Sequence, residues 1–320
     1  MTTPTTVRVG ALIWAQYTEW SAMMEAAALA DRLGYDDIWA WDHLVPIMGR
    51  EDGPIHEAFI TLAGWAAATR QARLGTMVAA NTFRNPALAV KMVTALDHMS
   101  GGRMVLGLGA AWFEPEHRVF GFDFGAGPGE RLDRLDEAAA LVRGMLDGRT
   151  SSARGPHYSA DGIANVPPPV QAKLPLLIGG GGERKTLQTV ARYADIWNIG
   201  GDLAEVRHKD EVLRDWCDKV GRDQSEIERS VSIGPVIIRD TVDSALQVAR
   251  AIGRHNGDWD EPMLLGSPNL VVDLVAPFVE LGFRTIHFDL PAPFDGETLE
   301  RFVGDVKPAL QAVAAARDAK

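Results

Sequence analysis

The sequence predicts an α/β protein folded as a (β/α)8 TIM barrel with insertion loops. Short apolar or β-branched runs alternate with longer segments of helical periodicity, which is typical of parallel strands joined by crossover helices. Eight such runs occur along the 320 residues, and eight is the strand number of a closed barrel. No internal repeat, linker or low-complexity tract divides the chain, so we expect one domain over residues 1–320.

The expected strands and helices alternate along the chain. The strands cover 7–13, 37–41, 73–78, 104–109, 174–180, 194–198, 230–238 and 283–290, and the helices cover 19–33, 57–69, 86–99, 130–147, 184–193, 203–220, 242–253 and 268–281. Asn85 and Pro86 supply a cap and a proline at the first helical position of the third helix. Gly34 and Gly101 allow the left-handed geometry that ends the first and third helices.

Three connections are longer than ordinary loops: 42–56, 110–129 and 148–173. The first two follow the carboxyl ends of expected strands, which is the face where barrel enzymes carry their chemistry, so we expect them to shape a pocket. The third precedes a strand, and it is either a packed surface excursion or a cover for the site.

Acidic residues outnumber basic ones by 43 to 32, which gives a net charge of −11. This charge argues against a general attraction to nucleic acids or anionic lipids, so an anionic ligand needs a local site. The chain begins without a basic segment followed by a long apolar stretch, and no apolar run is long enough to cross a bilayer. We expect a soluble, cytoplasmic protein that binds a small molecule.

Cysteine and histidine usage argues against a metal site. Cys217 is the only cysteine, which excludes an intrachain disulfide and a cluster of thiolate ligands. The eight histidines form no complete metal-binding spacing. We therefore expect no metal.

The stretch "LLIGGGGERKTL" places Gly179, Gly180, Gly181 and Gly182 between an apolar strand and an expected helix. Glycine lets backbone N–H groups approach a ligand, and a helix amino terminus attracts anions. Arg184 and Lys185 follow in the expected first turn and could add positive charge. The run is therefore interpreted as a phosphate cradle, with a merely tight strand-to-helix turn as the alternative. It matches neither a Walker loop nor a dinucleotide fingerprint, so it does not identify the ligand.

Asp42 and His43 end the expected second strand in "IWAWDHL". An imidazole at the barrel rim can exchange a proton near neutral pH, and a neighbouring carboxylate can orient it. The alternative is a histidine that caps the strand end by hydrogen bonding. His287 and Asp289 on the last expected strand could point into the barrel or out of it.

Several motifs occur together in order: "DIWAWDHL", "RLGTMVAANTFRNPALAVKMVTALDHMSGGRMVLGLGAAW", "EPEHRVFGF", "GERLDRLDEA" and "LPLLIGGGGERKTLQTVARYADIWN". Over nearly the whole chain this set resembles the bacterial luciferase-like flavin oxidoreductase superfamily, and more narrowly its coenzyme F420-dependent branch. The resemblance implies a TIM barrel with insertions, commonly a homodimer, that binds a flavin or 5-deazaflavin at the carboxyl face of the barrel.

The resemblance also implies roles for individual residues. Met77 and Val78 match a non-proline cis peptide bond in a bulge of the third strand, and this bulge, with Ala79, backs the cofactor ring. His43 matches the proton donor or acceptor near the reactive ring edge, with Asp42 beside it. The remaining matches are cofactor contacts: Gly109, Ala110, Ala111 and Trp112 border the ring and ribityl chain, while Gly179, Gly180, Gly181, Gly182, Glu183 and Arg184 hold the cofactor phosphate.

The sequence departs from the family pattern at two positions. The branch usually reads Gly-Ala-Gly-Trp where this chain has Ala111, so either the backbone there stays in an ordinary region or the loop shifts. A sugar-phosphate dehydrogenase of the family has an acid at the position of Trp112, so that enzyme's substrate and two-residue mechanism are not assigned here.

The aromatic residues of the first two strands predict an apolar substrate pocket. Trp14 and Trp41 are expected to line it with Met77 and Trp112, and core packing is the alternative. We expect Trp39 to pack in the core, with only one of Trp39 and Trp41 facing the barrel interior.

The favoured function is F420-dependent hydride transfer to or from a small organic substrate, with His43 assisting proton transfer. The first alternative is an FMN-dependent monooxygenase supplied by a separate reductase. The second is a flavin-binding protein without turnover, which would bind the cofactor tightly beside a closed substrate cavity.

Overall fold

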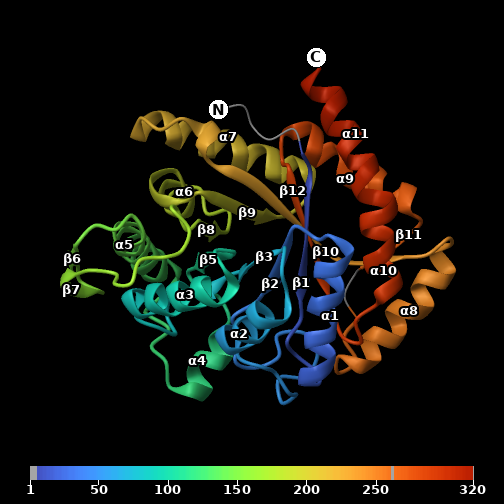
Figure 1. Ribbon diagram of the computed structural model, residues 1–320, viewed down its shortest axis with the longest axis horizontal. Coiled ribbons are helices and arrows are strands. Elements are labelled where there is room, and N and C mark those ends of the chain that lie inside the picture. The colour runs from blue at the N-terminus through green and yellow to red at the C-terminus, as the bar shows by residue number, and fades with distance from the viewer. Residues whose placement is uncertain (1–5, 261–262, 320) are drawn as a thin grey trace.

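Eight parallel strands close into a barrel in the computed structural model, which describes residues 6–260 and 263–319 (Figure 1). In ring order they are β1 (Arg8–Ile13), β2 (Asp37–Ala40), β3 (Arg73–Thr76), β5 (Met104–Gly109), β8 (Leu176–Gly179), β9 (Ile196–Gly200), β10 (Glu228–Ile238) and β12 (Thr285–Leu290). Pairing of β12 with β1 closes the ring. The TIM-barrel prediction is confirmed, and each expected strand overlaps an observed one.

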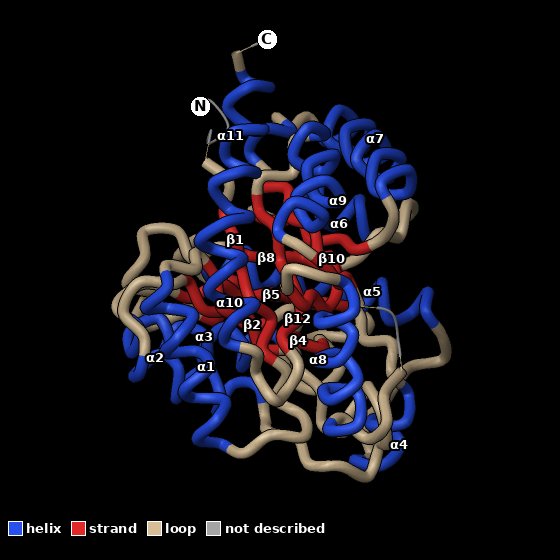
Figure 2. The backbone as a smooth tube through the Cα atoms, turned by 90° about the vertical axis from the view of Figure 1, so that its right-hand side faces the viewer, coloured by secondary structure: helices blue, strands red, loops and turns tan. Residues whose placement is uncertain are grey.

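Helices surround the strands on the outer side of the barrel (Figure 2). The eight expected helices correspond to α1 (Trp20–Leu33), α2 (Ala58–Ala68), α3 (Pro86–Ser100), α5 (Pro128–Leu146), α6 (Thr186–Tyr193), α7 (Leu203–Val220), α8 (Val242–His255) and α9 (Pro268–Leu281). The caps at the third helix form as expected, because the Asn85 side chain accepts a hydrogen bond from Ala87 N and Gly101 is left-handed. No helix in the described part of the chain is long and apolar enough to span a bilayer.

The structure adds elements that the sequence analysis did not place. These are α4 (Glu114–Phe120), α10 (Gly296–Arg301), α11 (Lys307–Asp318), the hairpin strands β6 (Ser151–Arg154) and β7 (Ser159–Ile163), and the short strands β4 (Ala79–Ala80) and β11 (Leu264–Gly266). A 3-10 turn (Gln224–Glu226) and a π-helical turn (Phe302–Val306) complete the set. No element was expected after the eighth strand, whereas α11 follows it and packs on α9 with Leu310 and Ala314 buried.

The connection 148–173 is a packed surface excursion. Its hairpin lies at the periphery of the molecule, beside α5 (Figure 1). The Asp97 carboxylate on α3 accepts hydrogen bonds from the backbone N–H groups of Val170 and Gln171 at 2.8 and 3.1 Å. The Tyr158 hydroxyl also donates to Asn81 O at 3.0 Å. Backbone hydrogen bonds to a buried carboxylate therefore fix this long loop on the outer helix layer.

Trp39 and Trp41 both face the barrel interior, so the expectation that only one of them could do so is wrong. Side chains two residues apart on a strand point to the same face. Both indoles belong to one buried cluster with Leu12 and Trp14. The same rule applies to His287 and Asp289, and the His287 Nδ1 atom accepts a hydrogen bond from Trp39 Nε1 at 3.1 Å inside the barrel.

The floor of the barrel is a charged network built from the first residues of five strands. Asp37 is fully buried and accepts hydrogen bonds from Arg73 Nε at 2.5 Å and from Arg8 Nη2 at 3.1 Å. The Arg73 Nη2 atom also donates to Glu228 Oε1 at 3.0 Å, and Thr285 donates to the same oxygen. This end of a TIM barrel contributes stability, and the opposite end carries the loops that form sites.

Candidate active site

The third barrel strand is interrupted by a bulge at the carboxyl face. The Met77–Val78 peptide bond is cis, as predicted, and it separates β3 from β4. The Val78 side chain lies against glycines of two neighbouring strands. A Cβ atom added to Gly109 would come within 2.5 Å of Val78 Cγ2, and one added to Gly179 within 3.0 Å of Val78 Cγ1. Packing against the bulge thus gives a direct reason for glycine at both positions.

Asp42 lies beneath this bulge rather than against His43. Its Oδ2 atom accepts a hydrogen bond from Ala80 N at 3.0 Å and from Arg84 Nη1 at 2.6 Å. Burial raises the pKa of Asp42, and the Arg84 guanidinium opposes the rise. Asp42 Oδ1 is buried without a hydrogen-bond partner in the described chain. The carboxylate therefore anchors the backbone that follows the cis bond.

The carboxylate that orients His43 comes from Glu116 on α4. The Glu116 Oε1 atom lies 2.9 Å from His43 Nδ1, and Glu116 Oε2 accepts a hydrogen bond from Leu44 N at 2.8 Å. Glu116 is 1% exposed. A carboxylate on Nδ1 favours the tautomer with a proton there, which leaves Nε2 to exchange a proton with a ligand. Nε2 makes no hydrogen bond within the described residues.

The loop between β5 and α4 places Trp112 beside this imidazole. Ala111 adopts φ 63°, so the alternative of an ordinary backbone conformation there is wrong. The loop keeps a left-handed residue without glycine, and Arg131 Nε donates to Ala111 O at 3.3 Å. The Trp112 ring centroid lies 5.7 Å from that of His43, and the residue is 63% exposed. Ala110 is partly buried against the core.

Trp14 and Trp41, the predicted pocket residues, stack on each other in the barrel interior with ring centroids 4.8 Å apart. Trp259, which follows α8, also packs against Trp14, with ring centroids 4.8 Å apart. All three are at least nine-tenths buried, and their Nε1 atoms have no hydrogen-bond partner in the described chain. Met77 belongs to the same cluster. The three indoles therefore pack in the buried interior of the barrel.

The carboxyl group of Asp289, on β12, has a strongly raised pKa. Burial raises its pKa to about 7. The folded protein thus binds this proton more tightly than the unfolded chain does. The contribution to stability is complete below the unfolded pKa of 3.8 and is lost as pH rises through about 7.

Asp289→Asn is therefore expected to raise the unfolding free energy at pH 8, where the aspartate would be a buried charge, by about 2 kcal/mol. This figure is smaller than the full pKa shift would give, because Asp289 is partly open to solvent. The gain should shrink toward zero as pH falls to 4. Thermal unfolding at several pH values measures it, with the exposed Asp161→Asn as the control. A gain that does not depend on pH would contradict this assignment.

The glycine run forms an open loop between β8 and α6. Gly180 adopts φ 115°, a conformation that favours glycine. The indole Nε1 atoms of Trp197 and Trp216 donate to Gly180 O and Glu183 O at 2.9 and 2.7 Å. The backbone N–H groups of Gly181, Gly182 and Glu183 donate no hydrogen bond within the described chain. The loop therefore keeps its donors available beside a helix amino terminus.

Of the charged residues that follow the glycines, Glu183 and Lys185 form ion pairs within the protein, whereas Arg184 does not. α6 begins at Thr186, so Arg184 and Lys185 precede the helix rather than occupy its first turn as expected. Lys185 binds Asp133 at 2.6 Å, and the Glu183 carboxylate accepts from Lys209 at 2.7 Å. Arg184 is exposed and makes no hydrogen bond or ion pair within the described residues. It is the cation of this loop that remains available to an anion.

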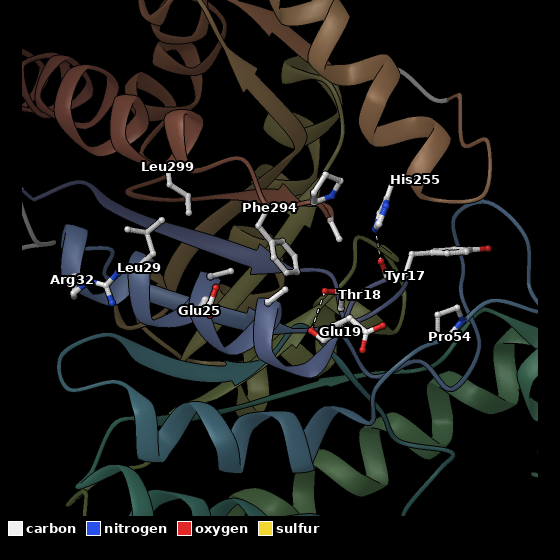
Figure 3. A pocket seen from close by; sticks show the side chains of 14 residues that line it. Tyr17, Thr18, Glu19, Glu25, Leu29, Arg32, Pro54, His255, Phe294 and Leu299 are labelled. Atoms are coloured by element: carbon white, nitrogen blue, oxygen red, sulfur yellow. Dashed lines mark hydrogen bonds between the residues drawn. The ribbon is translucent and has the colours of Figure 1, made fainter.

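A separate groove of about 810 Å³ lies along α1, on the outer side of the barrel wall (Figure 3). Leu29 and Arg32 of α1 line it together with Phe294 and Leu299 from the segment after β12. None of the residues assigned above to cofactor or substrate lines this groove. Within residues 6–260 and 263–319, no group of three or more His, Cys, Asp or Glu side chains could hold a metal ion.

The structure thus brings together His43, Trp41 and Trp112 at the rim, and it gathers Asp42, Val78, Gly109 and Gly179 around the bulge. Sequence reasoning missed Glu116, which is 73 residues from His43. The signal that could have found it is the motif "EPEHRVFGF", which places acids in a loop that follows a barrel strand.

Comparisons with known proteins agree with this architecture. The family model of the luciferase-like monooxygenases matches residues 5–258. An F420-dependent glucose-6-phosphate dehydrogenase of Microbacterium testaceum is 26% identical, with 90% of this chain and 93% of the relative covered.

Two solved structures share the fold at low sequence identity. An F420-dependent secondary alcohol dehydrogenase, solved with an F420-acetone adduct, superposes with a TM-score of 0.82 at 18% identity, covering 95% of this chain and 99% of the other. The oxygenating constituent of 3,6-diketocamphane monooxygenase from Pseudomonas putida, solved with FMN, has a TM-score of 0.74 at 17% identity, covering 95% and 98%.

Proposed function

Because the chain belongs to the luciferase-like monooxygenase family, we propose that it is an F420-dependent oxidoreductase that transfers a hydride between the deazaflavin and a small organic substrate. The observation that carries this proposal is the His43 imidazole, which Glu116 holds at the barrel rim with Nε2 available. Hydride transfer to a carbonyl carbon requires a proton on the oxygen, and the reverse reaction requires a base for that proton. His43 is suited to both.

The glycine loop fits the phosphate of such a cofactor. Its free N–H groups at 181–183, the unpaired Arg184 and the α6 amino terminus together form a local positive site in an acidic protein. The bulge at Met77–Val78 and the backbone of Gly109, Ala110 and Ala111 would border the ring system. When bound, F420 supplies a two-electron hydride carrier in which carbon replaces the flavin N5, with little reactivity toward oxygen.

The chain's own residues perform the other steps. Glu116 fixes the His43 tautomer through Nδ1, and Asp42 with Arg84 secures the backbone that follows the bulge. Trp14 and Trp41 exclude water from the barrel interior. His43 Nε2 then exchanges the proton with the substrate oxygen. In line with the family resemblance, we also propose a homodimer in the cytoplasm.

An FMN-dependent monooxygenase supplied by a separate reductase is the second candidate, and the FMN-bound structural neighbour favours it. The two candidates differ in the molecule that oxidises the reduced cofactor, which is an organic substrate for the F420 enzyme and oxygen for the monooxygenase. Under F420 hydride transfer, anaerobic oxidation of the reduced cofactor requires only an organic acceptor, and oxygen does not accelerate it. If turnover instead requires oxygen and reduced FMN, the monooxygenase is correct. If neither cofactor supports hydride exchange with any substrate, the protein is a flavin-binding protein without turnover.

Gly180→Val is expected to raise the cofactor Kd by about ten-fold or more, which corresponds to roughly 1.4 kcal/mol. The reason is that a β-branched residue cannot adopt φ 115° without moving the loop and its N–H donors. Fluorescence titration with the cofactor measures the change. Gly221→Val is the matched control, because Gly221 is left-handed at the end of α7, outside the glycine loop. An unchanged Kd for Gly180→Val would remove the loop from the cofactor site.

A further inference from the structure

Three aromatic rings surround the His43 imidazole, and we call Trp41, Trp112 and Phe113 the aromatic collar. Their ring centroids lie 5.9, 5.7 and 6.3 Å from that of His43, each near perpendicular to it. Trp41 is buried, whereas Trp112 is 63% exposed. The exposed Trp112 indole and the available imidazole nitrogen together offer one ligand an apolar surface and a proton-exchanging group.

Two neighbours support Trp112 in the loop: the backbone of Ala111 and the ring of Phe113. Ala111 holds the left-handed conformation, its carbonyl accepts from Arg131, and the Phe113 ring lies 5.3 Å from the Trp112 ring. His117 on α4 secures the same loop, because its Nδ1 atom lies 2.9 Å from Phe113 O. These contacts hold the backbone that carries the Trp112 indole at the rim.

The charges around the collar are unsuitable for an anionic substrate. Arg84 is neutralised by Asp42 at 2.6 Å and Glu57 at 2.5 Å. Arg131 is 7% exposed, with its guanidinium 3.8 Å from the centre of the Phe124 ring. Arg118 follows Glu116 by two residues and so points to the other side of α4. Arg184 belongs to the glycine loop, where the cofactor phosphate is assigned.

We propose that the aromatic collar selects an uncharged substrate with a flat hydrocarbon ring, such as an aryl ketone or the matching secondary alcohol, and rejects a sugar phosphate. This inference rests on the proposed function of the same site. The ring packs on the Trp112 indole while the substrate oxygen reaches His43 Nε2. In reduction, a hydride supplied by the reduced deazaflavin, which would thereby be oxidised, bonds to the carbonyl carbon as the C=O π electrons move to the oxygen. The oxygen takes the Nε2 proton of a doubly protonated His43, which is left as the neutral Nδ1–H imidazole.

The test is saturation-transfer NMR on F420-loaded protein with acetophenone and, separately, glucose 6-phosphate. Acetophenone is expected to bind at least about ten-fold more tightly than glucose 6-phosphate. Trp112→Ala should weaken acetophenone binding by about ten-fold, a clearly larger loss than the same change causes in cofactor affinity. Trp20→Ala is the matched control, because Trp20 is an exposed indole beside another histidine, His56, at 5.6 Å. It should change neither affinity.

Three results would overturn the proposal: tighter binding of glucose 6-phosphate, no acetophenone binding to the unaltered protein, or equal losses of cofactor and acetophenone affinity in Trp112→Ala. The last result would instead make the Trp112 side chain a cofactor contact. Failure of F420 to bind would count against the proposed function alone. In that case, the same acetophenone comparison on FMN-loaded protein still decides whether the collar selects the substrate.

Discussion

His43→Ala is expected to lower turnover by about 10²-fold or more while leaving the cofactor Kd nearly unchanged. Glu116 lies 2.9 Å from the imidazole, and within the described residues no hydrogen bond or ring contact joins His43 to the glycine loop that we propose for the cofactor phosphate. Steady-state kinetics with reduced cofactor, combined with a fluorescence titration, separates the two effects. Full activity of the variant would demote His43 to a structural residue.

Glu116→Gln distinguishes a catalytic imidazole from one that only packs. The amide preserves the side-chain volume, but it has one oxygen to serve both His43 Nδ1 and Leu44 N. We expect a loss in kcat of about ten-fold with little change in KM, because the imidazole loses part of the contact that orients it. A purely structural role of Glu116 would lower the unfolding temperature without lowering the kcat of the folded variant.

Asp37→Ala is expected to destabilise the protein by about 3–5 kcal/mol. Burial opposes ionisation of Asp37, but Arg73 and Arg8 outweigh it and hold the pKa of this carboxyl well below its usual range. Removal of the carboxylate would leave these guanidinium groups in the barrel floor without their central partner. The stability that Asp37 contributes is present at neutral pH and is lost only as pH falls far below 3.8.

Urea unfolding at pH 7 measures this effect. The matched control is Asp52→Ala, because the Arg50–Asp52 pair lies at 2.7 Å on the surface with both side chains at least 70% exposed. That variant should leave the unfolding midpoint unchanged, since solvent screens such a pair. Equal midpoints for the two variants would show that the floor network does not stabilise the barrel.

The barrel could be predicted because strand periodicity and helix boundaries are local properties of the sequence. Asn85 caps α3 through its own side chain, and the eight apolar runs became the eight barrel strands. The cis peptide bond between Met77 and Val78 could be predicted only from the family resemblance, because no local sequence propensity favours a non-proline cis bond.

The partners of the site residues could not be predicted, because they are brought together by folding. The nearest acid in sequence, Asp42, binds Arg84 and Ala80 N, whereas His43 is paired with the distant Glu116. Gly109 and Gly179 are explained by contact with Val78, another non-local feature. Trp39 packs in the core as expected, and the one error was avoidable, because the alternation of side chains on a strand puts Trp39 and Trp41 on one face.

The most direct test of F420-dependent hydride transfer is a fluorescence titration of the purified protein with oxidised F420 and, separately, with FMN. We expect an F420 Kd of about 1 μM or lower, with FMN bound at least about ten-fold more weakly. Tighter binding of FMN than of F420 would contradict F420-dependent hydride transfer and favour the oxygenase component of a two-component system.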